Sequence, residues 1–166
     1  NRPSGLALNP SGLWIAETGA NRLVLADPAT GAIRLRVEMG TPPFALAAAQ
    51  DRLFAALPGA NQVAAVAGDG TILWQTELDG LGLPQNLAYD SATDLLYVLY
   101  LLAPHYGQVA VMDGRDGRII DRIEPNLSRT LRNAQALAVD SANGLLVVST
   151  SLGGETFRLS DRSYAG

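Results

Sequence analysis

The chain has 166 residues, 48% of them hydrophobic and 17% charged, and its formal net charge is -4. Cysteine is absent, which excludes disulfides and Cys-based metal sites, and a negative charge without a clustered basic stretch argues against nucleic acid as a partner. The longest apolar run, Leu95 to Ala103, is too short for a membrane helix, so no membrane insertion is expected.

The first predicted strands lie in Pro3 to Gly40, a stretch that recurs along the rest of the chain in imperfect copies. Short apolar segments alternate there with turns, and the segments are Leu6 to Leu8, Leu13 to Ala16, Asn21 to Leu25 and Ile33 to Val37. Such lengths are typical of β-strands. In the last segment Ile33, Leu35 and Val37 are predicted to share one face.

The later copies begin at Pro43, Pro84 and Ala134, and the anchors Leu6, Leu46, Leu87 and Leu137 recur at intervals of about 40 to 50 residues. A period of this size built from short strands is the spacing of propeller blades. We therefore predict an all-β fold, a β-propeller of about four blades of four-stranded antiparallel sheet. As a single propeller domain or segment, its blades are approximately 3–40, 43–79, 84–125 and 134–166.

The last copy is incomplete. Leu159 to Gly166 aligns with Leu25 to Gly31, which predicts that the sequence stops in the turn after the third strand of the last blade. Propellers usually have about 4 to 8 blades and leave only short, protected edges. We expect part of a larger propeller, or a portion that assembles with a partner or with itself; a four-bladed ring with a three-stranded last blade is the alternative. The first and last blades are expected to expose apolar sheet faces.

The first copy carries a family resemblance. Its segment LWIAETGANRLVLADPATGAI resembles the bacterial YVTN and NHL class of β-propeller repeats, and VEMGTPPFALA resembles the junction between two such blades. The resemblance covers essentially the whole chain and implies an extracytoplasmic protein, secreted or on the cell surface. It selects no activity, because binding modules, scaffolds, lactonases and lyases share these repeats.

The copies differ most in the loops on one face of the predicted propeller, called here the loop face. Blade 3 has an insertion from Leu101 to Gly107, and the connection to blade 4 is enlarged from Pro125 to Ala134. Insertions on one face of a repeat protein often mark its binding face, although exposed loops also vary freely. The candidate binding residues on this face are His105, Tyr106, Asn126, Arg129, Arg132 and Glu17.

Catalytic constellations are hard to find. The single histidine excludes mechanisms that need two, and there is no G-x-S-x-G elbow, H-E-x-x-H site or P-loop. Propeller lactonases that resemble this class bind a divalent metal with acidic and Asn side chains around the central channel. The equivalent inner-strand entrances here contain no carboxylate: Ser4-Gly5, Phe44-Ala45, Gln85-Asn86 and Gln135-Ala136.

Only Glu17 and Asn86 are available for such a metal site, and two ligands are too few. We therefore predict no catalytic residue, metal or cofactor, and a non-catalytic binding or scaffolding module that contacts a protein partner through its loop face. The alternative is part of a metal-dependent propeller hydrolase, lactonase or lyase.

The large aromatic residues have two interpretations. Trp14 and Trp74 either line a ligand pocket together or, as we favour, fill the space between blade sheets. Tyr97 and Tyr100 lie three apart on one strand and therefore on opposite faces, so at most one is expected in the core. Tyr97, which aligns with Trp14, is the predicted buried member.

Overall fold

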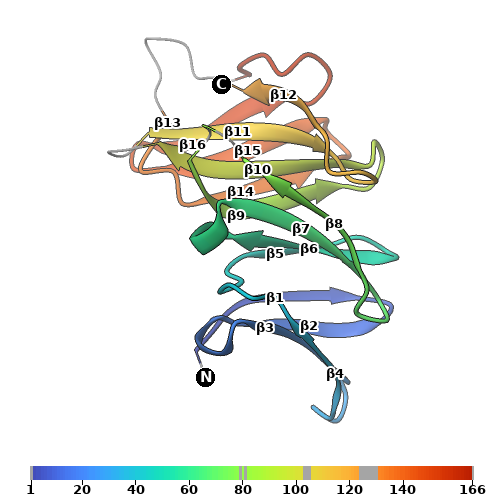
Figure 1. Cartoon of the computed structure of the whole chain (residues 1–166). Helices are drawn as coiled ribbons and strands as arrows, with labels where there is room; N and C mark the ends of the chain where they lie inside the picture. Colours follow the sequence, from blue (N-terminus) through green and yellow to red (C-terminus); the bar gives the residue numbers. More distant parts are fainter. Residues whose placement is uncertain (1, 79, 81, 103–105, 124–130, 166) are drawn as a thin grey trace.

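The structure, a computed structural model, describes residues 2–78, 80, 82–102, 106–123 and 131–165. Its strands form four antiparallel sheets that follow one another in chain order, from the first sheet in blue to the last in red (Figure 1). Two short 3-10 helices, η1 (Thr18–Ala20) and η2 (Pro58–Ala60), join the second and third strands of blades 1 and 2. Within the described ranges, no helix has the length and apolar character needed to cross a membrane.

Each sheet is one blade, and its strands pair in sequence order except for the short last strand of blade 3, which pairs two strands back. Blade 1 contains β1 (Pro3–Asn9), β2 (Gly12–Glu17), β3 (Arg22–Ala26) and β4 (Ile33–Glu38). Blade 2 contains β5 (Leu46–Ala48), β6 (Arg52–Leu57), β7 (Gln62–Ala67) and β8 (Ile72–Glu77). Blade 3 contains β9 (Leu83–Asp90), β10 (Leu95–Leu102), β11 (Tyr106–Asp113), β12 (Ile119–Ile123) and the short β13 (Leu131–Arg132). Blade 4 contains β14 (Ala136–Asp140), β15 (Leu145–Thr150) and β16 (Gly153–Arg158), and the arrangement confirms a propeller of about four blades with an incomplete last blade.

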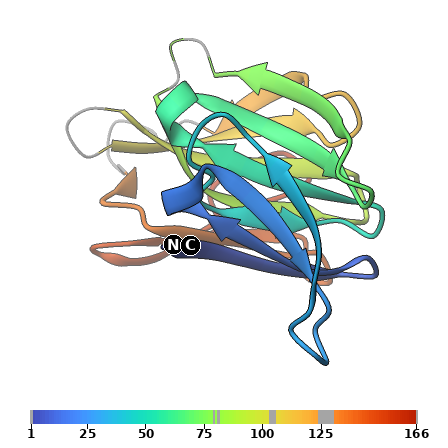
Figure 2. The same cartoon turned by 60° about the horizontal axis from the view of Figure 1, so that its bottom comes forward.

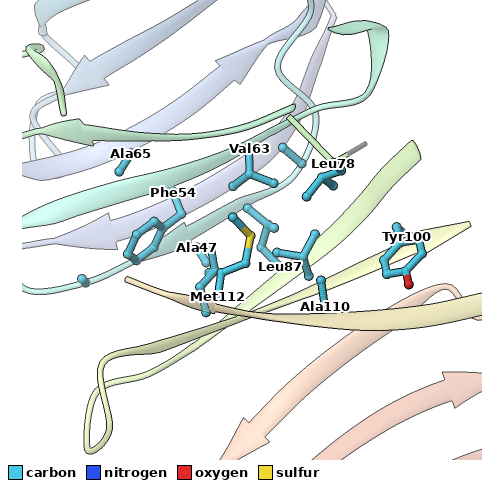
Figure 3. Packing of buried hydrophobic residues seen from close by; sticks show 13 residues of the cluster. Ala47, Phe54, Val63, Ala65, Leu78, Leu87, Tyr100, Ala110 and Met112 are labelled. Atoms are coloured by element: carbon cyan, nitrogen blue, oxygen red, sulfur yellow. The ribbon is translucent and has the colours of Figure 1, made fainter. Parts of the chain in front are cut away.

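The core lies between the blades. The described residues form three buried clusters, one at each junction of successive sheets. Figure 3 shows the cluster at the second junction, where Phe54 and Val63 of blade 2 face Leu87 and Met112 of blade 3. Burial of this apolar surface, at roughly 25 cal/mol per Å², is what holds sheet against sheet.

A repeated pair explains how large rings fit near the crowded inner strands. In blades 1 to 3 an alanine on the first strand lies opposite an aromatic residue on the second. The pairs are Ala7 with Trp14, Ala47 with Phe54, and Ala88 with Tyr97. All three rings are fully buried, which confirms that Trp14 packs between sheets. Trp74 packs at the second junction instead, so the two tryptophans do not share a pocket.

The expectation that only one of Tyr97 and Tyr100 is buried was wrong. Both side chains are 0% exposed. Their side chains do lie on opposite faces of β10, but Tyr100 packs toward blade 2 and Tyr97 toward blade 4. An interior blade has both faces covered, so the alternation that leaves one face in water in an ordinary antiparallel sheet does not apply.

The prediction that Ile33, Leu35 and Val37 share one face was also wrong, at Ile33. The pairing of β3 with β4 shifts register so that Leu25 faces Leu35 but Ala26 faces Ile33, which leaves Arg34 as an extra residue. This bulge turns Ile33 to the other face, where it is 48% exposed, while Val37 stays buried. Blades 2 and 3 have the same shift between their third and fourth strands.

The last turn of the chain differs from its predicted alignment. The amide of Arg158 donates to Ser163 O and the amide of Arg162 to Arg158 O, which is the pattern that Asp27 begins in blade 1. Arg162, and not a glycine, takes the left-handed position with φ of 60°. Tyr164 then bridges to Phe157 beside β16, at the place of a fourth strand. By residue similarity, Asp161 would be the equivalent of Asp27 in this turn. The backbone hydrogen bonds show that Arg158 is its equivalent instead.

Replacing Gly117 by alanine is expected to destabilise the chain by about 2 to 4 kcal/mol. Its φ is +73°, and a Cβ there would lie 2.5 Å from Trp74 Cε3 of the adjacent blade. Gly31 is the matched control, because its φ is +72° but a Cβ there would meet nothing within 4 Å. Gly31→Ala should cost only about 1 kcal/mol. Urea unfolding compares the two, and equal losses would show that the contact with blade 2 is not tight.

Candidate functional site

The first strands of all four blades begin around one depression on the loop face, with a volume of about 450 Å³. Its lining includes Ser4 of blade 1, Phe44 before blade 2, Gln85 and Asn86 of blade 3, and Gln135 before blade 4. Close approach of the strands requires Gly5, because a Cβ there would lie 2.5 Å from Phe44 O. The radial arrangement therefore brings residues from four copies to one site.

The described lining mixes apolar side chains, such as Leu6, Phe44 and Leu101, with the polar side chains of Ser4, Gln85, Asn86 and Gln135, and it carries no ionisable side chain. Ser4 Oγ donates to Phe44 O at 2.8 Å and lies 2.5 Å from Thr18 Oγ1, which itself donates to Pro43 O at 2.7 Å. Asn86 Oδ1 accepts from the amide of Leu137 at 3.5 Å. These groups can hydrogen-bond peptide amides and other neutral polar groups, but they offer no acid or base near neutral pH.

An aromatic and cationic pair lies next to residues in contact with the lining, since a Cβ at Gly107, which follows Tyr106, would meet the lining residue Ala134 at 2.8 Å. β13 pairs with β11, so that Arg132 lies opposite Tyr106. The Arg132 guanidinium stacks over the Tyr106 ring, with its Cζ 5.6 Å from the ring centroid, and Nη2 donates to the phenol oxygen at 3.3 Å. The pair stays accessible, since Tyr106 is 37% exposed. Ala134 and Gln135, which follow Arg132 closely in the chain, line the depression.

The structure brings together only part of the predicted set. Tyr106 and Arg132 are in contact, whereas Glu17, at the end of β2, forms an ion pair with Arg22 at 2.6 Å. His105, Asn126 and Arg129 lie outside the described residues.

No metal centre is built by the described part of the chain, which contains no group of three or more His, Asp or Glu residues placed to hold an ion. Asn86 lines the depression, but Glu17 is engaged with Arg22 and does not join it there. The described lining of the depression does not include Trp74, whose Nε1 donates to Gly114 O at 3.3 Å, in the turn that follows β11.

Sequence reasoning did not select Gln85 and Gln135 as binding residues. Gln85 lies near the start of β9, and Gln135 directly precedes β14. Both strands are inner strands with small side chains. The signal that could have found them is this recurring position, because the entrances of all four inner strands converge in a propeller. As metal ligands, amides without carboxylates are unsuitable.

Comparison with known proteins places the chain in a family. A sequence model of the family described as outer membrane protein assembly factor BamB matches residues 2–163. None of the curated proteins compared with the sequence matches it.

Solved structures show the same fold at low identity. BamB from Moraxella catarrhalis has a TM-score of 0.72 and 16% identity, and the match covers 99% of this chain and 49% of that one. Sqt1 from Saccharomyces cerevisiae has a TM-score of 0.73 and 14% identity over 93% of this chain and 43% of that one. The computationally designed Ika4 protein has a TM-score of 0.73 and 14% identity, over 96% of this chain and 92% of that one. The chain thus spans about half the length of the two natural propellers.

Proposed function

This chain belongs to the family of the outer membrane protein assembly factor BamB, and from that premise we propose that it is a non-catalytic β-propeller module that binds another protein through its loop face. The observation that carries the proposal is the stacked Tyr106 and Arg132 pair, together with a depression whose described lining is uncharged and combines apolar side chains with amides. Protein binding needs such a surface, whereas hydrolysis needs the ionisable groups that the described lining lacks.

Tyrosine and arginine are the residue types that most often dominate protein interfaces. Stacking on Tyr106 orients the Arg132 guanidinium before any partner arrives, which lowers the conformational entropy lost on binding. The guanidinium has N–H groups beyond the one directed at the phenol oxygen, and these suit a carboxylate. The amides of Gln85 and Gln135 suit a peptide backbone.

The partner chemistry that fits this surface is therefore an extended protein segment with an acidic side chain over Arg132. His105, Asn126 and Arg129 remain predicted contacts from their places in the two inserted loops. The family description supports an extracytoplasmic location, and we propose that location for this chain. Membership of the YVTN and NHL class remains a prediction.

Replacing Arg132 by alanine is expected to weaken peptide binding about tenfold, which corresponds to about 1.4 kcal/mol. The probe is a displayed library of random linear peptides selected on the immobilised chain. Selected peptides should be enriched in Asp and Glu, and their affinity is then measured for the parent and the variant by titration calorimetry.

Arg118→Ala is the matched control. Arg118 lies in the turn between β11 and β12, at the opposite end of β11 from Tyr106, and is highly exposed. Its replacement should leave affinity unchanged. Equal affinities for the parent and Arg132→Ala, or selection of peptides without acidic residues, would contradict the proposal.

A further inference from the structure

The turn between β15 and β16 carries a large apolar side chain in solvent. Leu152 is 80% exposed, the highest value of the large hydrophobic residues in the described part of the chain. The turn has only two residues, Ser151 and Leu152, between the paired Thr150 and Gly153. Two-residue turns favour Asn, Asp and Gly, so neither turn chemistry nor burial accounts for a leucine at this position.

Hydrogen bonds within the turn fix the backbone around Leu152. Thr150 Oγ1 accepts from the amide of Leu152 at 3.1 Å and donates to Gly153 O at 3.0 Å. Gly153 has a φ of +130°, which favours glycine. Because the backbone on both sides of Leu152 is held, little conformational entropy remains to be lost there when a partner covers its side chain.

This turn is attached to the segment that carries Arg132. The amide and the Oγ of Ser151 donate to Arg132 O at 3.2 and 3.3 Å, and the amide of Gln135 donates to Ser149 O at 3.1 Å. The backbone of this segment is thus fixed to blade 4, while stacking on Tyr106 fixes the Arg132 side chain to blade 3. The exposed leucine therefore belongs to the same surface as the stacked pair.

The equivalent connections in the first two blades carry no large apolar side chain. They are the helices η1 and η2, which end in Gly19-Ala20 and Gly59-Ala60. In Figure 1 and in Figure 2, η1, η2 and the turn between β15 and β16 lie on the same side of the molecule, the loop face. Compared with blades 1 and 2, blade 4 therefore adds an apolar side chain to the loop face, beside Arg132.

We propose that Leu152 is the apolar contact of the protein-binding surface, and that the bound segment places an apolar side chain on it, close to the acidic side chain over Arg132. This inference rests on the proposed function and narrows it to segments with both residue types. A partner that covers Leu152 removes its side chain from water, which favours binding. An acidic residue alone leaves the leucine exposed, so the second contact selects among acidic segments.

The experiment selects a displayed library of random linear peptides on the immobilised chain and on its Leu152→Ser variant. Peptides selected by the parent should carry an aliphatic or aromatic residue close to their Asp or Glu. The variant should bind these peptides about tenfold more weakly in titration calorimetry. Because Leu152 is exposed, urea unfolding of the parent and the variant should coincide, which separates a loss of affinity from a loss of fold.

Leu73→Ser is the matched control. Leu73 is also an exposed leucine, at 48%, and it lies on β8 near the end of β7 that is farthest from η2. It is therefore away from the loop face, and its replacement should leave the affinity for the selected peptides unchanged.

The outcomes separate this inference from the proposed function. Acidic peptides without a recurring apolar neighbour, or equal affinities of the parent and Leu152→Ser, would overturn the role of Leu152 and leave the proposed function intact. Peptides that lose affinity with Leu152→Ser but not with Arg132→Ala would support the role of Leu152 and overturn the acidic contact. A library that yields no binding peptide, or binding that neither variant weakens, would contradict both.

Discussion

Trp14→Ala is expected to lower the free energy of unfolding by about 3 to 5 kcal/mol, the largest effect of any single core change. Trp14 is fully buried at the first junction, where it packs among residues from blades 1 and 2. Its ring fills a space that Ala7, directly opposite, cannot fill. Truncation would remove apolar burial and leave a cavity that two rigid sheets cannot close. Urea denaturation followed by circular dichroism measures the loss.

Trp14→Phe tests how much of the stabilisation comes from the aromatic ring and how much from the indole N–H. Trp14 Nε1 is buried and has no hydrogen-bond partner among the residues that the structure describes, so phenylalanine gives up some volume but also removes this N–H. We expect it to cost well under half of the alanine loss. A phenylalanine variant as unstable as Trp14→Ala would contradict the view that Trp14 stabilises the junction through its buried apolar ring.

Asp90→Ala is expected to destabilise the chain by about 2 to 4 kcal/mol at neutral pH. The Asp90 side chain is 1% exposed and accepts hydrogen bonds from Thr93 Oγ1 and Ser141 Oγ, each at 2.6 Å, and from the Ala92 amide at 3.1 Å. Ser141 belongs to the next blade, so this carboxylate connects blades 3 and 4. Alanine would remove the charged acceptor that these three donors share, and with it the hydrogen bond between the two blades.

The loss of stability caused by Asp90→Ala is expected to become smaller as the pH falls. Burial by itself would raise the pKa of Asp90, but the hydrogen bonds from Ser141, Thr93 and the Ala92 amide outweigh burial and hold this pKa below its usual value of 3.8. A lowered folded pKa contributes stability that is present above the unfolded pKa and is lost as pH falls through the folded one. The difference in unfolding free energy between the parent and Asp90→Ala should therefore be full at pH 7 and shrink below about pH 4.

Asp140 supplies the control for Asp90. It has the equivalent place in blade 4, but within the described part of the chain its carboxylate accepts from its own turn, from the amide and the side chain of Asn143 at 3.1 and 2.6 Å. Asp140→Ala should destabilise the chain less than Asp90→Ala, since no contact between blades is lost. Comparable losses at both positions would contradict the role assigned to Ser141.

The blades could be read from the sequence because their signals are local. Alternating apolar segments and turns at a period of about 40 residues encode strands, and the structure contains them in four sheets. The turn at Arg158 was misaligned because closure there depends on backbone hydrogen bonds and a left-handed Arg162, which residue similarity does not reveal.

The candidate site was only partly predictable. Tyr106 and Arg132 were selected from their inserted loops, but their stacking depends on the pairing of β13 with β11, two segments separated in the chain. Gln85 and Gln135 carried no signal of their own as binding residues. Their importance comes from the convergence of four inner strands, which is a property of the ring.

The sequence by itself determined the strands, the turns, the repeat and hence the propeller, because each follows from side-chain alternation and turn chemistry within one copy. Only the tertiary structure decided which faces are covered. Tyr100 is buried and Leu8 is exposed although both are apolar positions on regular strands, because one sheet has neighbours on both sides and the other has a neighbour on one. Burial depends on the neighbouring blade, and no pattern within a single blade contains that information.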